Sequence, residues 1–130
     1  MTLSPPEGAA DRSTEGPRDP DCLFCRIVSG DVPAEVVGQD EQAVAFRDLD
    51  PQAPLHVLVV PRAHHRDVAA LSVADPDALG AVVRLGARIA QDEAQGDFRL
   101  VFNNGASAHQ SVFHVHGHVL GGRDLTWPPG

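Results

Sequence analysis

Histidines are the residues of this chain whose types and spacing most clearly indicate chemistry. All seven lie between His56 and His118, and three of them alternate at His114, His116 and His118. Alternate side chains of a regular strand lie about 7 Å apart on one face, so these three imidazoles would span roughly 13 Å. One metal ion cannot bind all three over that distance unless the strand distorts, so we expect the three histidines to have different roles. A site of metal ligands only and a structurally satisfied polar face are the alternatives.

A polar loop of small residues precedes the alternating histidines. Its polar positions are Asn103, Gly105, Ser107, Gln110 and Ser111. The backbone N–H groups and hydroxyls of such a loop can bind an anion, above all a phosphate. A neutral imidazole beside that phosphate can attack the phosphorus atom and form a phosphohistidine-type intermediate, which water then cleaves. The unperturbed pKa of histidine, about 6.5, provides a neutral imidazole at pH 7 without special tuning.

The elements that position these residues can be predicted from periodicity and from turn residues. Strands are expected at residues 35–37, 43–47, 55–60, 98–102 and 112–120. A short helix is expected over Cys22–Val28, and a long one after Asp75 and Pro76, ending at Gly96, where apolar residues recur at helical spacing. These elements predict an α+β fold with a mainly antiparallel five-stranded sheet, one long helix and one short helix.

The strand predicted at 112–120 has two distinct faces. One face carries the three alternating histidines, and the other is expected to pack against the core and the long helix. The residues expected on the core face are Phe113, Val115, Gly117 and Val119.

Length and charge narrow the class of protein. The chain has 130 residues, which suits one domain, and a net charge of −8 from 18 acids and 10 arginines, with no lysine. Such acidity argues against bulk electrostatic binding to nucleic acid or to an anionic membrane. No transmembrane run or secretory signal is evident, so we expect a cytoplasmic protein. Residues 1–20 are rich in proline and charge and are predicted to be a disordered tail, with the domain at residues 21–130.

Several segments resemble one known family. Residues 110–120, QSVFHVHGHVL, resemble the signature of the histidine triad (HIT) family, His-x-His-x-His with hydrophobic x. The ending GGRDLTWPPG is similar to that of the Hint branch, the histidine triad nucleotide-binding proteins, and AFRDLDPQAP and HVLVVP also match. The resemblance covers about residues 22–130. It implies the HIT fold, a homodimer and a purine nucleotide substrate of the AMP or GMP type.

The activity that the resemblance implies is hydrolysis of nucleoside phosphoramidates of the adenosine 5′-monophosphoramidate type. His116 would be the nucleophile, and His118 would support or protonate around the phosphate. The implied catalytic residues are His116, His118, His56 and Ser111. The implied nucleotide contacts are Asp48, Leu49, Asn103, Gln110, Ser111 and His118. A dinucleoside polyphosphate hydrolase and a nucleotide-binding module with little catalysis are the alternatives.

The cysteine pair resembles that of bacterial members of the family, in which it forms a zinc site with two histidines. The ligands carried over to this chain are Cys22, Cys25, His64 and His114. Two thiolates and two imidazoles suit a tetrahedral structural zinc site. A free thiol pair and a redox pair are the alternatives, and the neighbouring His65 competes with His64 as a ligand.

Two residues depart from the family pattern. Gly117 stands where a bulky residue is usual inside the triad, which predicts looser packing behind His116. His109 stands where glycine is usual, which predicts a different loop shape or an added cation.

Overall fold

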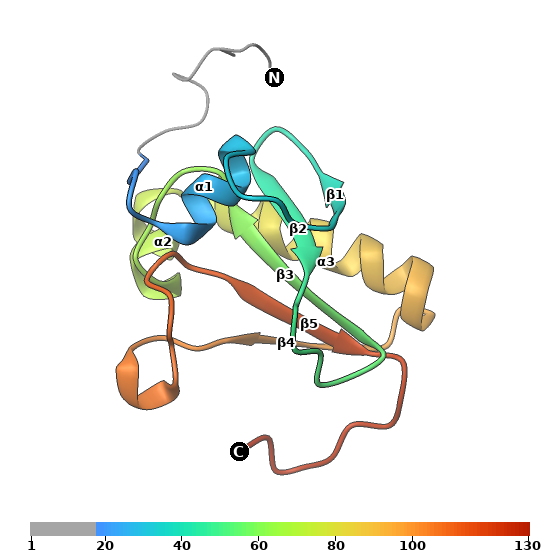
Figure 1. Ribbon diagram of the computed structural model, residues 1–130. Helices are drawn as coiled ribbons and strands as arrows, with labels where there is room; N and C mark the ends of the chain where they lie inside the picture. The colour runs from blue at the N-terminus through green and yellow to red at the C-terminus, as the bar shows by residue number, and fades with distance from the viewer. Residues whose placement is uncertain (1–17) are drawn as a thin grey trace.

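The protein is described by a computed structural model over residues 18–130, so most of the predicted tail at residues 1–20 lies outside the described part. One sheet of five strands has the order β1-β2-β3-β5-β4, and every neighbouring pair is antiparallel. The elements are α1 (Leu23–Ser29), β1 (Val36–Gln39), β2 (Ala43–Arg47), β3 (Leu55–Pro61), α2 (Val68–Ala74), α3 (Pro76–Ala94), β4 (Phe98–Phe102) and β5 (Gly117–Gly121). The predicted α+β class and five-stranded sheet are confirmed (Figure 1).

The two faces of the sheet are covered by different helices (Figure 1). Helix α3 packs on the face formed by Ala43, Val57 and Val59, and Val119 of β5 joins the same cluster. Gly86 lets α3 approach closely, because a Cβ there would lie 2.9 Å from Val119 Cγ2. This face therefore carries the main core, as the pattern of the last strand predicted for Val119.

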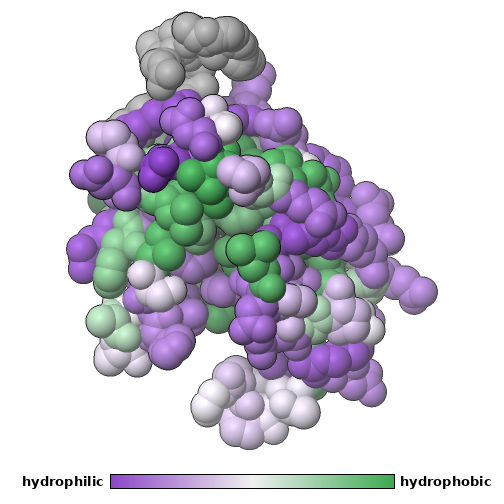
Figure 2. All heavy atoms as spheres, in the orientation of Figure 1, coloured by the Kyte–Doolittle hydropathy of each residue, from purple (hydrophilic) through white to green (hydrophobic). Residues whose placement is uncertain are grey.

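Helix α1 covers part of the opposite face. Phe24 and Cys25 pack there with side chains of β2 and β3, among them Phe46 and Leu58. Figure 2 shows hydrophobic side chains gathered on the side of the molecule where α1 lies. Because Leu58 pairs with His118 across the β3–β5 ladder, His118 lies on this face as well.

The prediction of one long and one short helix was incomplete, because the described residues contain a second short helix, α2. Asp67 caps it by accepting a hydrogen bond from the backbone N–H of Ala70, and the helix ends at Asp75, which also caps α3. Leu71 is the one residue of α2 that is fully buried. A helix of seven residues with so little buried surface has too weak an apolar periodicity to be recognised.

The predicted strand at 112–120 was wrong in its first half, since β5 begins only at Gly117. The backbone N–H of Val115 donates to the carbonyl of His65, 2.8 Å away, in the connection between β3 and α2. The ring of His114 points at the same region, where it meets the two cysteines. These contacts hold the segment outside the sheet ladder.

Two expectations for this segment are corrected, the core-face position of Phe113 and the loose packing at Gly117. Phe113 is 37% exposed and lies under the guanidinium of Arg66, 4.5 Å from its ring centroid, instead of packing in the core. Behind Gly117 the packing is not loose: a Cβ there would lie 3.0 Å from Leu100 Cδ1 and 3.1 Å from Phe102 Cε1. Side chains of β4 thus fill the space that a bulky residue would occupy.

Candidate functional site

The histidines form two adjoining groups on the α1 side of the sheet. His114 joins the cysteines, His118 joins His56, and His116 lies between the groups with its ring centroid 5.1 Å from that of His118. The three alternating histidines therefore have different surroundings, and their different roles stay a prediction.

The first group brings together the four residues expected to bind zinc. His114 Nδ1 lies 3.4 Å from the Sγ atoms of both Cys22 and Cys25, and His64 Nδ1 lies 3.5 Å from Cys25 Sγ. All four ligand atoms lie within 4.8 Å of one another. The first turn of α1 positions the cysteines, because Cys22 is its N-cap and accepts from the backbone N–H of Cys25. This cluster could hold a metal ion.

The protonation of His114 suits metal binding. Its Nε2–H donates to the backbone carbonyl of Pro61, 2.9 Å away, so the lone pair of Nδ1 faces the two sulfurs. A second hydrogen bond of this kind orients most metal-binding histidines. Burial lowers the pKa of His114 to about 4, so the ring is neutral at pH 7 without having to release a proton.

The Cys25 thiol needs a nearby cation to ionise near neutral pH. Burial raises the pKa of Cys25 to about 11, although the backbone N–H of Asp19 points at its sulfur and opposes the rise. A divalent cation reverses this preference, because it stabilises thiolate directly. The four side chains therefore suit a bound dication such as zinc better than they suit a site without a metal.

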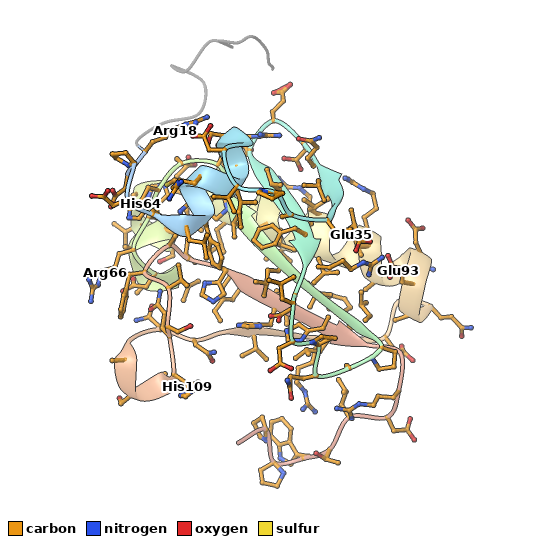
Figure 3. The ribbon with its side chains drawn as sticks, in the orientation of Figure 1. Arg18, Glu35, His64, Arg66, Glu93 and His109 are labelled. Carbon is orange, nitrogen blue, oxygen red and sulfur yellow. The ribbon has the colours of Figure 1, made fainter. Side chains whose placement is uncertain are left out.

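Of the two adjacent histidines, the structure places His64 in the cluster and His65 outside it. The Nε2 atom of His65 is buried and has no hydrogen-bond partner within residues 18–130, while its backbone carbonyl holds Val115. Figure 3 labels His64 in the segment that leads from β3 to α2. His65 thus holds, through its backbone, the residue that follows His114.

His116 is buried, and the lone pair of its Nε2 atom is free. Its Nδ1–H donates to the backbone carbonyl of His114 at 2.9 Å, which leaves Nε2 unprotonated in the neutral ring. The ring is 7% exposed, and its centroid lies 5.0 Å from that of Phe24, edge to face. Burial lowers the pKa of His116, so the neutral, nucleophilic form prevails at pH 7.

The second group joins β3 to β5. His56 Nε2 lies 3.0 Å from His118 Nδ1 and 3.5 Å from Asp48 Oδ2, and the backbone N–H of Gln52 donates to His56 Nδ1 at 2.9 Å. Burial, followed by the neighbouring His116 and His56, lowers the pKa of His118 to about 4.

Three ligand-type atoms of this second group also lie within 4.8 Å of one another, yet a metal does not fit them. The lone pair of His56 Nδ1 is occupied by the Gln52 N–H, so the proton of a neutral His56 sits on Nε2. A metal at Nε2 would require an imidazolate anion. The second group is therefore a hydrogen-bonded chain, and the cysteine group is the candidate metal site.

The polar loop before the histidines is organised by a residue that the sequence suggested as a ligand contact. Gln110 is buried, its Oε1 accepts from the backbone N–H of Gly105, and its Nε2 donates to the carbonyls of Arg66 and Val112. All its polar atoms are thus used within the protein. The sequence signal that could have indicated this structural role is the position of Gln110 at the end of the polar loop.

The other expected nucleotide contacts differ in exposure. Leu49 is fully exposed, Ser111 is exposed, and Asn103 is half-buried. Asp48 Oδ1 accepts from the backbone N–H of Asp50, while its second oxygen faces His56. His109 adopts a left-handed conformation at the end of the short 3-10 helix Ala106–Ala108 and is exposed, and Figure 3 shows it well away from the labelled His64.

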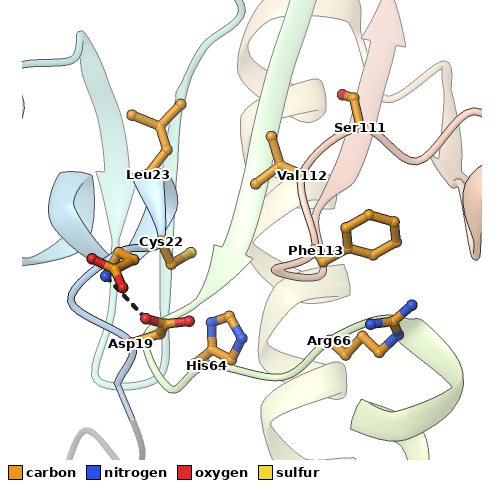
Figure 4. Close-up of a pocket in the computed structure, with 9 residues that line it drawn as sticks. Asp19, Cys22, Leu23, His64, Arg66, Ser111, Val112 and Phe113 are labelled. Atoms are coloured by element: carbon orange, nitrogen blue, oxygen red, sulfur yellow. Dashed lines mark hydrogen bonds between the residues drawn. The ribbon is translucent and has the colours of Figure 1, made fainter.

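An open pocket of about 440 Å³ adjoins the cysteine cluster. Cys22 and His64 form part of its wall, and Ser111 lies at another edge. Figure 4 shows Arg66 beside the ring of Phe113 across the pocket from Cys22. No sequence pattern indicated that Arg66 and Phe113 would line a pocket, since their pairing depends on the irregular segment before β5.

The HIT domain family matches residues 29–125 of this chain. The chain belongs to the HIT domain family. The Cys22–Cys25 pair beside His64 and His114 fits the CxxC zinc-binding variant of the family. No helix within residues 18–130 is both long and apolar enough to cross a membrane.

Similar proteins include named members of the family. Adenylylsulfatase HINT1 of Arabidopsis thaliana is 40% identical, over 88% of this chain and 80% of its own length. A HIT family hydrolase from Legionella pneumophila has a TM-score of 0.80 and 42% identity, over 85% of this chain and all of its own. A zinc-bound histidine triad family protein from Mycobacterium smegmatis has a TM-score of 0.69 and 34% identity, over 80% of this chain and 76% of its own.

Proposed function

We propose that this protein is a nucleotide hydrolase that cleaves purine nucleoside phosphoramidates of the adenosine 5′-monophosphoramidate type. The observation that carries the proposal is the free Nε2 of His116, which is fixed by the hydrogen bond from Nδ1 to the carbonyl of His114. The similarity to a HIT family hydrolase and to an enzyme named for adenylyl sulfate supports hydrolysis at a nucleotide phosphorus.

The reaction has two steps on one histidine. The Nε2 lone pair of His116 attacks the α-phosphorus, the P–N bond breaks, and the amine departs with the bonding electrons and gains a proton. Water then attacks the phosphorus, which releases the nucleoside monophosphate and restores the imidazole. In the intermediate the ring carries a positive charge, and the His114 carbonyl that accepts its Nδ1–H stabilises that charge.

Six residues are proposed to contact the nucleotide. Asp48 and Leu49 would bind ribose and base, and Ser111 would contact the phosphate and the leaving group; Asn103, His118 and the loop of Gln110 complete the set. His56 and Ser111 are proposed to support catalysis beside His116 and His118. Their support is the match to the family motif, together with the contact of His56 and His118.

Zinc is proposed to occupy the cluster of Cys22, Cys25, His64 and His114. The zinc-bound relative from Mycobacterium smegmatis supports this choice, and the donor set is typical of structural zinc. Bound there, zinc would tie the start of α1 to the β3–α2 connection and to the segment before β5. No step of the reaction involves the metal.

Parallel assays with His116→Ala as the control separate the candidate activities. Purified protein receives a fluorogenic adenosine phosphoramidate, adenylyl sulfate and a diadenosine polyphosphate. We expect turnover of the phosphoramidate that His116→Ala abolishes. Preference for the polyphosphate would favour the dinucleoside polyphosphate hydrolase, and nucleotide binding without any turnover would favour a binding module. Preference for adenylyl sulfate would shift the substrate toward that of the Arabidopsis relative.

A homodimer and a cytoplasmic location complete the proposal. Light scattering should give about twice the chain mass of 13.8 kDa, and a monomer at micromolar concentration would contradict the dimer. Both cysteines are free thiols, which suits a reducing compartment. We propose no nucleic acid or membrane partner, because the charge of −8 repels polyanions.

A further inference from the structure

Gln110 closes the polar loop of residues 103–111 onto itself. Its backbone N–H donates to the carbonyl of Gly105 at 3.1 Å, and its Oε1 accepts the backbone N–H of Gly105 at 2.8 Å. One residue thus holds both backbone hydrogen-bonding groups of Gly105. Two residues proposed to contact the nucleotide stand on either side of this closure, Asn103 before Gly105 and Ser111 after Gln110. The shape of the loop, and with it the positions of those two residues, therefore depends on Gln110.

The side chain of Gln110 also fastens the loop to the connection between β3 and α2. Its Nε2 donates to the carbonyl of Arg66 at 2.8 Å and to that of Val112 at 3.1 Å. Gln110 is 4% exposed, so these hydrogen bonds cannot break without leaving polar groups unpaired in a buried place. A second tie, from the N–H of Ala69 to Asn104 Oδ1, is exposed, so water competes for both groups. Gln110 is therefore the stronger of these two ties.

The candidate metal site joins the same two stretches of chain. His64 and His114 each offer a ligand atom, and these atoms lie within 4.8 Å of each other. His64 lies in the β3–α2 connection, two residues before Arg66, and His114 lies four residues after Gln110. A metal held by both histidines would therefore close the two stretches that Gln110 ties. Stretches that are fixed at one of these points lose less conformational freedom when they are fixed at the other.

We propose that a metal in the cysteine cluster and a nucleotide at the polar loop bind cooperatively, and that Gln110 is the positioning residue that couples the two sites. The inference rests on the proposed function for the nucleotide and on the proposed zinc for the metal. The metal takes no part in the reaction. It holds the connection to which Gln110 is fastened, and so keeps Asn103 and Ser111 in place. By thermodynamic linkage, the nucleotide must raise the affinity for the metal by the same factor.

Zinc affinity measures this coupling without any turnover. A competing chelator sets the free zinc concentration, and zinc binding is measured with and without saturating AMP, in the wild type and in Gln110→Met. Methionine has a side chain of similar length that cannot donate a hydrogen bond and accepts one only weakly. We expect AMP to raise the zinc affinity of the wild type by about tenfold, within the usual range for coupled sites, and that of Gln110→Met by about twofold or less.

The matched control is Gln91→Met, because Gln91 is exposed on α3, which covers the other face of the sheet. This variant should keep the full effect of AMP on zinc affinity. An AMP effect of the same size in the wild type and in Gln110→Met would overturn the role of Gln110. A wild type that binds AMP with no change in zinc affinity would overturn the coupling itself. A wild type that does not bind AMP would refute the proposed function, and hydrogen exchange would then decide the link between metal and loop.

Hydrogen exchange at Gly105 tests that link with no nucleotide present. The N–H of Gly105 is held by Gln110 Oε1, so its exchange rate reports how often the loop opens. We expect removal of zinc to speed this exchange by about tenfold in the wild type, whereas Gln110→Met should exchange fast with or without zinc. The amides of β3, whose residues are all buried, are the internal reference and should stay protected. Unchanged exchange at Gly105, or an equal loss of protection in β3, would overturn the proposal, because zinc would then not act on the loop through Gln110.

Discussion

The imidazole of His116 and the backbone of His114 are joined by a hydrogen bond of 2.9 Å from Nδ1 to the carbonyl oxygen. His114 thereby links His116 to the cysteine group, because its own ring faces the sulfurs of Cys22 and Cys25. The same hydrogen bond leaves Nε2 of His116 unprotonated in the neutral ring, as the proposed role of this atom as the nucleophile requires. The ring of His114 thus faces the proposed metal site, and its backbone carbonyl orients His116, the proposed nucleophile.

Loss of a zinc ligand should cost metal and stability together. Protein purified without chelator should contain about one zinc per chain, and Cys25→Ser should contain less than a tenth of that. The midpoint of thermal unfolding should fall in Cys25→Ser, because metal binding contributes directly to folding free energy. His65→Gln is the matched control, since His65 adjoins His64 but lies outside the cluster, and it should retain zinc. Metal-free wild-type protein would contradict the assignment.

Acidification should destabilise the protein partly through His118. The pKa of this histidine falls from 6.5 to about 4 in the folded state, chiefly through burial. Above pH 6.5 the ring is neutral in both states and its full contribution is present. As the pH falls from 6.5 to 4, the unfolded chain binds a proton that the folded chain excludes, so the free energy of unfolding decreases.

Urea unfolding at several pH values measures this contribution. His118→Asn should show a shallower loss of stability between pH 6.5 and 4 than the wild type. Identical slopes in the two proteins would mean that His118 has an ordinary pKa in the folded state.

A bulky residue at Gly117 should be destabilising, not stabilising. Leu100 and Phe102 already occupy the space in front of the Cα atom, so Gly117→Leu should cost about 1–3 kcal/mol of overpacking. Phe102→Ala opens a cavity and should also destabilise by itself. The double variant should be more stable than the sum of the two losses predicts. Additive losses, measured by urea unfolding, would show that the two positions do not share one space.

Nucleotide binding should depend on Asp48 far more than on Asp50. Asp48 is proposed to accept hydrogen bonds from the ribose, and a charged hydrogen bond contributes about 1.5–3 kcal/mol. Asp48→Asn should therefore weaken AMP binding by roughly tenfold or more, as measured by calorimetry. Asp50→Asn is the control, because the Asp50 side chain is exposed in the same turn. Equal affinities for both variants would place the ribose elsewhere.

Most of the sheet could be predicted because its strands obey local rules. Residues 43–47 and 98–102 form strands with the predicted bounds, and Asp75 with Pro76 starts the long helix as their types indicate. The resemblance also named the four residues of the cysteine cluster, which the fold brings together from three separate segments. Local propensity sufficed for these strands and this helix, and the family resemblance supplied the cluster.

Other features depend on contacts that no local pattern records. The alternation of residues 112–116 is typical of a strand, yet the ring of His114 and the N–H of Val115 are held by distant partners. The fit of Gly117 depends on where Phe102 of the neighbouring strand lies. The hydrogen bond to His56 Nδ1 comes from the backbone N–H of Gln52, so the residue type at position 52 gives no sign of it.

The most direct test of the account is to trap the nucleotide on its histidine. Protein quenched in acid-free denaturant during turnover of an adenosine phosphoramidate should carry an adenylyl group on the peptide that contains His116. Tandem mass spectrometry should place it on that ring, and His116→Ala should carry none. An adduct on another residue, or full turnover by His116→Ala, would contradict the role of His116 as the nucleophile.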